Sequence, residues 1–215
     1  MIDVIRQIEA VHREVGQGRL PAGEGHAVTL RRTYIAPIDD VWDALTDPER
    51  IGRWFLPISG DYRLGGRYQF EGNAGGEILE CDKPTRLKVS WVYMDTGNPA
   101  DVSEVVLRLT PEGDDATTLE LEHTAIVTDE MWDQYGPGAV GVGWEGGLLG
   151  LELHLRGGSI EDPVAWQIGP EGRDFNTRSS MAWGAASRVA GVDEATIARN
   201  VEQTTAFYVP ASEGA

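Results

Sequence analysis

Residues 32–70 constrain the fold more than any other part of the chain. Their first half reads RTYIAPIDDVWDALTDPERIGRWF, and their second half ends in DYRLGGRYQF. A β-like run ends before Pro37, and apolar residues with helical spacing follow over 41–45. Pro48 begins a second helical turn, and Gly66 leads into the next strand. This order of a strand, two short helices and hairpins predicts an α+β fold in which a curved sheet wraps around another element.

Short segments with alternating apolar side chains predict an antiparallel sheet, because turn-forming residues separate them at hairpin spacing. Clusters such as Gly72-Asn73 and Lys83-Pro84 supply the turns. The expected strands cover residues 27–35, 67–71, 76–82, 86–94, 102–110 and 117–127.

A long C-terminal helix is predicted over residues 143–155, where Trp144, Leu148, Leu151 and Leu155 form a single stripe. We expect this helix to lie across the concave face of the sheet. Its interior glycines each cost about 1 kcal/mol relative to alanine. Close backbone packing, or space left for a ligand, must compensate for that cost.

The chain beyond this helix is expected to cover the helix's opposite face, which carries Leu149 and Leu153. Residues 173–208 contain two helix-like runs, and Asp193 is suited to cap the second. We expect these runs to pack as helices on the long helix, or across a second copy of the chain in a homodimer.

A short amphipathic helix is expected at the N-terminus, where Ile5 and Ile8 lie on one side, and a glycine-rich linker follows over 16–25. The expected division of the chain is therefore 1–25 for the N-terminal helix and linker, 26–158 for the sheet domain and 159–215 for the C-terminal helical extension.

The charge of the chain excludes some classes of partner. Its 215 residues carry a formal net charge of −17, and the pI is near 4.5. Phosphate groups need clustered Lys and Arg, so we expect no binding to nucleic acid or to a membrane surface. No run approaches the roughly 18 apolar residues of a membrane span. The charged N-terminus is unlike a signal peptide and the single Cys81 suits a reducing compartment, so we expect a cytoplasmic location.

The sequence contains no recognisable catalytic motif, whether a Walker loop, GxSxG, HExxH or CxxC. The four histidines are scattered without the spacing of metal ligands. We therefore expect no metal and no cofactor, and whether the chain is an enzyme stays open.

Three polar residues are predicted to point toward the concave face. His123 alternates with Leu121, Arg32 shares parity with Leu30, and Glu77 is a third candidate on a strand that alternates poorly. In a cavity these side chains would orient a carbonyl or carboxylate, and His123 is the candidate acid/base. The alternative is structural, with His123 hydrogen-bonded in the core and Arg32 and Glu77 either paired with each other or reaching the rim. An unpaired buried charge is too costly, so an inward Arg32 needs a partner.

Aromatic and leucine side chains complete the predicted cavity, since a central strand and the long helix face each other there. Aromatic residues also fill ordinary cores, so packing is the alternative interpretation. The full set of predicted cavity residues is Arg32, Tyr68, Phe70, Glu77, Trp91, Tyr93, His123, Trp144, Leu148 and Leu151.

A set of residues and short motifs is spread through the predicted strands, helices and turns: Arg32, Ala36-Pro37, Val41-Trp42, Thr46-Asp47-Pro48, Trp54-Phe55, Gly65-Gly66, Pro84, Leu87, Trp91, His123 and Gly143-Trp144. Through this set, residues 27–155 resemble the SRPBCC (START-like) superfamily, and within it the branch related to the C-terminal domain of the heat-shock protein 90 ATPase activator. The resemblance implies a helix-grip fold, in which a curved antiparallel sheet grips the long helix around a hydrophobic cavity. It does not carry over a catalytic set.

Three functions follow from these observations as hypotheses. The first is a cytoplasmic protein that binds a small hydrophobic or aromatic molecule in its cavity. The second is an enzyme of the polyketide cyclase or aromatase type, with His123 as acid/base in the same cavity. The third is a chaperone-interaction module, although the chain offers no segment long enough to match the additional N-terminal domain of the eukaryotic activator.

Overall fold

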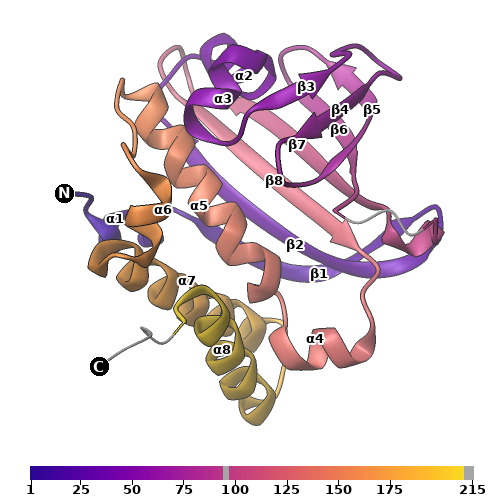
Figure 1. The fold of residues 1–215 in the computed structure, drawn as a ribbon, viewed down its shortest axis with the longest axis vertical. Helices are drawn as coiled ribbons and strands as arrows, with labels where there is room; N and C mark the ends of the chain where they lie inside the picture. The colour runs from indigo at the N-terminus through magenta and orange to yellow at the C-terminus, as the bar shows by residue number, and fades with distance from the viewer. Residues whose placement is uncertain (94–96, 211–215) are drawn as a thin grey trace.

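The computed structural model, which describes residues 1–93 and 97–210, contains one curved antiparallel sheet with a long helix across its concave face (Figure 1). Within these residues the sheet has eight strands in the order β1-β2-β8-β7-β6-β5-β4-β3. This confirms the predicted α+β helix-grip fold. The strands are β1 (His12–Leu20), β2 (Gly23–Tyr34), β3 (Ile58–Gly60), β4 (Arg67–Phe70), β5 (Gly75–Asp82), β6 (Arg86–Trp91), β7 (Ser103–Pro111) and β8 (Thr117–Ala125).

Helix α5 is the element that the sheet grips, and the other helices lie around it (Figure 1). Helices α2 and α3 lie over one end of the sheet, while α7 and α8 lie on the far side of α5. The α-helices are α1 (Val4–Glu9), α2 (Ile38–Thr46), α3 (Pro48–Trp54), α4 (Asp129–Tyr135), α5 (Gly138–Leu155), α6 (Pro163–Ile168), α7 (Pro170–Val189) and α8 (Glu194–Tyr208), and Pro99–Asp101 form a 3₁₀ turn.

The prediction of a linker over residues 16–25 is wrong, because these residues form the end of β1, the turn and the start of β2. In the register of this hairpin Val15 lies opposite Val28. A Cβ at Gly18 would come within 2.6 Å of the side chain of Thr124. Glycine is needed here for a close approach between chain segments rather than for flexibility, so the glycine spacing suggested the wrong structure.

Several smaller elements differ from the expectations. Helix α5 begins at Gly138 rather than at residue 143, and α4, α6 and β3 were not predicted. Strand β6 ends at Trp91, while Met94, the predicted end of that strand, lies outside the described residues. Helix α4 begins with an N-cap, because the side chain of Thr128 accepts a hydrogen bond from the backbone N–H of Met131. Helices α4 and α6 are each only about two turns long, which leaves little periodicity to recognise in a sequence.

The C-terminal extension packs as helices on the back face of α5, which we define as Leu149 and Leu153. Leu149 is fully buried in a cluster with Phe175 of α7 and Val4 of α1, and Leu153 packs against the same cluster. Burying one leucine side chain stabilises a fold by about 1.5–3 kcal/mol, which accounts for an ordered extension.

Only some of the apolar residues of the extension are buried. Trp183 of α7 and Ile197 of α8 are buried, but Val189 and Phe207 are exposed. A Cβ at Gly141 of α5 would overlap the indole of Trp183, so this glycine lets α7 approach α5 closely. Close packing therefore compensates for the cost of this interior glycine.

Two buried ion pairs fix α5 to the first two strands. Arg13 of β1 donates to Glu145 with Nε at 2.7 Å and Nη2 at 2.6 Å, and both side chains are at least nine-tenths buried. Seven residues further along α5, Glu152 lies 3.5 Å from Nη2 of Arg32 on β2. These acids lie on one side of α5, and the pairs set its position across the sheet.

Candidate ligand-binding cavity

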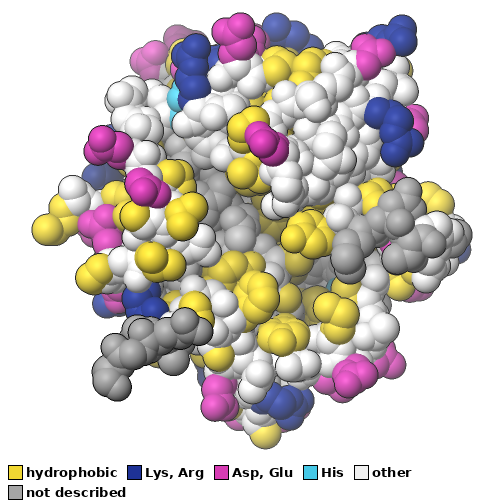
Figure 2. All heavy atoms as spheres, in the orientation of Figure 1, with side chains coloured by type: hydrophobic (Ala, Val, Ile, Leu, Met, Phe, Trp, Pro, Cys, Tyr) yellow, Lys and Arg dark blue, Asp and Glu magenta, His cyan; other side chains and the backbone are white. Residues whose placement is uncertain are grey.

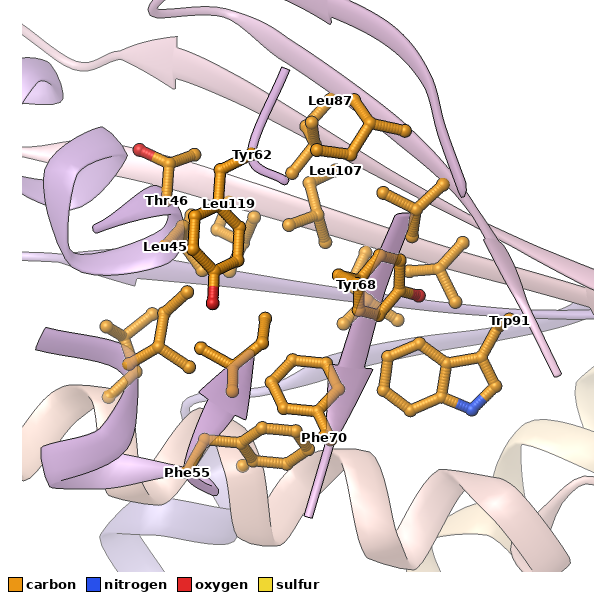
Figure 3. Close-up of a pocket in the computed structure, with 18 of the residues that line it drawn as sticks. Leu45, Thr46, Phe55, Tyr62, Tyr68, Phe70, Leu87, Trp91, Leu107 and Leu119 are labelled. Atoms are coloured by element: carbon orange, nitrogen blue, oxygen red, sulfur yellow. The ribbon is translucent and has the colours of Figure 1, made fainter. Parts of the chain in front are cut away.

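A cavity of about 160 Å³ lies between α5, the α2–α3 pair and the concave face of the sheet (Figure 3). Its wall is almost entirely apolar. The lining residues are Leu45, Thr46, Ile51, Trp54, Phe55, Ile58, Tyr62, Arg63, Tyr68, Phe70, Ile78, Cys81, Leu87, Val89, Trp91, Val105, Leu107, Leu119, Leu121, Trp144, Gly147, Leu148 and Leu151. In the space-filling view hydrophobic side chains gather around a hollow at the centre of one face, and charged side chains lie mainly toward its rim (Figure 2).

Aromatic rings form one wall of this cavity. Phe55, at the end of α3, meets Phe70 edge to face at 5.1 Å and stacks on Trp144 at 6.4 Å between ring centroids. Trp91 lies 4.9 Å from Trp144 and 5.6 Å from Phe70. Edge-to-face and tilted contacts of this kind are favourable between aromatic rings and present both edges and faces to a guest molecule.

Two polar groups deep in the wall already have partners in the protein. Tyr68 donates to the carbonyl of Ser90 at 2.7 Å, and burial raises the pKa of its hydroxyl. Trp54 Nε1 donates to the carbonyl of Ala44 at 3.0 Å. The interior therefore offers a ligand apolar surface more than hydrogen bonds.

Six of the ten predicted cavity residues line the cavity. Tyr68 and Phe70 come from β4 and Trp91 from β6, and in Figure 3 the rings of these three lie on one side of the space. The remaining three, all from α5, are Trp144, Leu148 and Leu151. That they hold a ligand stays a prediction.

His123 does not line the cavity but lies beside Trp144, which does. Trp144 Nε1 donates to His123 Nδ1 at 3.0 Å, and because an indole nitrogen only donates, Nδ1 is unprotonated. Nε2 then carries the proton and donates to Ser103 Oγ at 2.8 Å, and Ser103 donates to the carbonyl of Trp91 at 2.6 Å.

The environment of His123 favours the structural interpretation. Burial lowers the pKa of its imidazole to about 4, so the ring is neutral at pH 7. Both ring nitrogens are occupied by the hydrogen bonds to Trp144 and Ser103. The placement of His123 in the cavity was therefore wrong, because a residue of inward parity can lie behind another inward side chain.

Arg32 is buried as predicted but points away from the cavity. Its Nη2 donates to Gln7 Oε1 at 2.6 Å and faces Glu152, and its guanidinium lies 5.4 Å from the centroid of the Tyr34 ring. The partner proposed for it, Glu77, is on the opposite surface of the sheet. The concave face is divided by α5, so parity alone does not say on which side of the helix a residue lies.

Glu77 and Tyr93 are both exposed, so their placement in the cavity was wrong. The register of β5 against β6 shifts between Ile78 and Glu80, which is the mark of a β-bulge. The extra residue reverses the alternation, so Ile78 and Cys81 both line the cavity. Tyr93 lies two residues beyond the end of β6 and is 67% exposed.

The β3–β4 loop contributes two lining residues that the sequence did not indicate, Tyr62 and Arg63. They lie just before Gly65-Gly66, which we interpreted only as a turn. Phe55 is not in the predicted cavity set, yet it also lines the cavity. In the sequence these residues stand between a short helix and a turn. That position does not predict the direction in which a side chain points.

The described ranges contain no group of three or more His, Cys, Asp or Glu side chains placed to hold a metal ion. Every helix within the same ranges is too short or too polar to span a bilayer.

A helix-grip domain that encloses an apolar cavity is the class of protein that this fold and site define. The model of the family described as "Activator of Hsp90 ATPase homolog 1-like protein" matches residues 35–155, which is more than half of the chain. The chain belongs to this family. The resemblance inferred from the sequence is thereby confirmed. A search of curated proteins gave no match.

The chain is also similar to solved structures. The chain is 41% identical to CalU16 from Micromonospora echinospora, and the crystal structure aligns with a TM-score of 0.66 over 83% of this chain and 99% of CalU16. DynU16, described as a putative protein in the dynemicin biosynthetic locus, is 25% identical, with a TM-score of 0.51 over 60% of this chain and 47% of DynU16. MLL2253 from Mesorhizobium loti shares the fold at 24% identity, with a TM-score of 0.53 over 62% of this chain and 99% of that protein.

Proposed function

We propose that the chain binds a small hydrophobic or aromatic molecule in the cavity between α5 and the sheet. The observation that carries the proposal is an almost entirely apolar space of about 160 Å³, in which Tyr68 and Trp54 already donate their polar hydrogens to protein carbonyls. Polar groups that fix the orientation of a ligand usually stand free in a pocket, so this wall favours a guest held by apolar contact.

The size of the cavity suits a molecule built on one substituted aromatic ring. A dry apolar cavity of about 150 Å³ is known to take up benzene. An aromatic side chain buries about 150–250 Å², and at about 25 cal/mol per Å² this is about 4–6 kcal/mol. Such a ligand would bind with a dissociation constant of about 0.04–1 mM, and a larger natural ligand that also contacts the opening would bind more tightly.

The test is an NMR titration with p-xylene that follows the indole N–H signals of Trp91 and Trp144. We expect saturable shifts at both signals. Gly147→Leu should weaken binding at least tenfold, because Gly147 lines the cavity. Gly146→Leu is the matched control, since a Cβ at Gly146 meets no other atom within 4 Å. Non-saturable shifts in the wild type, or equal effects of the two variants, would refute the proposal.

The catalytic alternative uses the same cavity, and the description of DynU16 favours it because that relative belongs to a biosynthetic locus. The neutral, fully bonded His123 does not supply the acid/base that this alternative requires. Among the described residues that line the cavity, the titratable side chains are Tyr62, Arg63, Tyr68 and Cys81. Mass spectrometry of an aromatic polyketide-like probe, before and after incubation, distinguishes binding from conversion.

The family description favours the chaperone alternative in the same way. It predicts that the chain stimulates the ATPase activity of Hsp90, and that Gly147→Leu leaves this stimulation unchanged. The ligand-binding proposal requires no such stimulation.

A further inference from the structure

The opening of the cavity carries polar groups that the interior lacks, and two of them come from the loop between β3 and β4. Tyr62 is 40% exposed and Arg63 has a side chain that is 78% exposed, yet both line the cavity. They therefore lie where the apolar space meets solvent. A ligand with one polar end would place that end here.

The Tyr62 hydroxyl is free to bind a ligand. In the close-up view it points into the space enclosed by the lining side chains (Figure 3). Across the described part of the chain it has no hydrogen-bond partner, in contrast to the hydroxyl of Tyr68, which donates to Ser90. A phenol can donate to an oxygen atom of a guest.

Arg63 stands next to it with unused donors. Its Nε donates to Asp61 Oδ2 at 2.6 Å, which anchors the guanidinium at the opening. Its two terminal nitrogens have no hydrogen-bond partner within the described residues. A planar guanidinium with two free NH₂ groups matches an anionic oxygen group, and hydrogen bonds between charged groups are the stronger kind.

The loop that carries both residues is held in place before any ligand arrives. Gly65 N donates to the carbonyl of Ile78 at 2.8 Å, and Ile78 N donates to that of Gly66 at 2.9 Å. Gly65 has a φ of +77°, a conformation that favours glycine, and a Cβ at Gly66 would overlap the carbonyl of Asp61. Binding therefore costs little loop ordering, which is the usual penalty for recognition by a loop.

We propose that the ligand is a small aromatic molecule with an anionic oxygen group, such as a carboxylate, that the Tyr62 hydroxyl and the Arg63 guanidinium hold at the cavity opening. This inference rests on the proposed function and specifies its ligand class. The net charge of −17 does not oppose it at close range, since salt screens exposed charges beyond about 8 Å.

The test uses two probes of the same shape, p-xylene and 4-methylbenzoate, titrated into the full chain by NMR. Arg63→Met should weaken 4-methylbenzoate about five- to tenfold and change the affinity for p-xylene less than twofold. Tyr62→Phe should weaken 4-methylbenzoate about threefold. Arg19→Met is the control for net charge, because Arg19 has a side chain that is 84% exposed and does not line the cavity.

The outcomes separate the two proposals. If neither probe binds saturably to the wild type, the ligand-binding proposal itself fails. If p-xylene binds but Arg63→Met leaves 4-methylbenzoate as tightly bound as in the wild type, the cavity is real and the anionic anchor is wrong. An equal loss of 4-methylbenzoate affinity in Arg19→Met would also overturn the anchor, because it would reflect overall charge.

Discussion

Helix α5 has two faces that perform different tasks. Its back face is covered by other helices, because Leu149 is fully buried between α1 and α7 and Leu153 packs against the same cluster. Its cavity face, which we define as Trp144, Gly147, Leu148 and Leu151, borders a space of about 160 Å³. The comparison teaches that the C-terminal extension stabilises α5 by packing on its back face. The cavity face can therefore keep space for a ligand.

Buried charges sit between the two faces and hold the helix in register with the sheet. Glu145 and Glu152 each meet an arginine from the first two strands. A buried ion pair is rarely more stabilising than an apolar pair of the same size, but removal of one member is costly. The position of α5, and with it the shape of the cavity, depends on these pairs.

The largest expected effect comes from breaking one of these pairs. Glu145→Leu leaves the guanidinium of Arg13 buried without its carboxylate, and should lower the free energy of unfolding by about 3–5 kcal/mol. Urea denaturation measures this loss. The double variant Arg13→Met/Glu145→Leu should recover most of it. Glu14→Leu is a matched control that removes an exposed ion pair with Arg31, and should cost less than about 1 kcal/mol.

A double variant as unstable as Glu145→Leu alone would show that the stranded charge is not the cause. The two faces of α5 would then differ in packing alone.

The next effect compares the two faces directly through adjacent leucines. Leu149→Ala should cost about 3–4 kcal/mol, because the cavity it opens is surrounded by packed side chains. Leu148→Ala should cost about 1–2 kcal/mol less, because Leu148 already borders empty space and has fewer contacts to lose. Thermal and urea denaturation of both variants give the comparison. Equal losses would mean that the cavity face is packed as closely as the back face.

The third effect is a pH dependence centred on His123. The folded imidazole has a pKa of about 4, against 6.5 for the unperturbed group. The unfolded chain binds this proton first, so stability should fall as pH drops from 6.5 toward 4, by up to about 3 kcal/mol. His123→Gln should be less stable at pH 7 but should lose less between pH 6.5 and 4. Parallel pH profiles of the two proteins would contradict the buried, neutral imidazole.

The sheet and the two helix faces were predictable because their patterns are local. The stripe of Trp144, Leu148 and Leu151 identified the side of α5 that faces the sheet, and Leu149 identified the side that needs cover. Alternation in β6 and β8 placed Trp91 and His123 toward the concave side. These features follow from the helical and strand periods alone.

The partner of each inward side chain was not predictable, because it depends on elements far apart in the sequence. Arg32 meets Gln7 and Glu152, and His123 meets Trp144 and Ser103. The bulge in β5 adds one residue and so changes which side chains point inward. A prediction based on strict alternation of side chains cannot include such a bulge. Glycines that allow close packing look the same in a sequence as glycines of a flexible linker.

The most direct test of the central claim is a crystal structure determined under xenon pressure, because xenon enters dry apolar cavities. We expect xenon density between α5 and the sheet, against Phe55, Trp144 and Gly147. Gly147→Leu should remove that density, while Gly146→Leu should keep it. Absence of xenon from this space in the wild type, with side chains closed over it, would contradict the claim that the cavity face of α5 leaves room for a ligand.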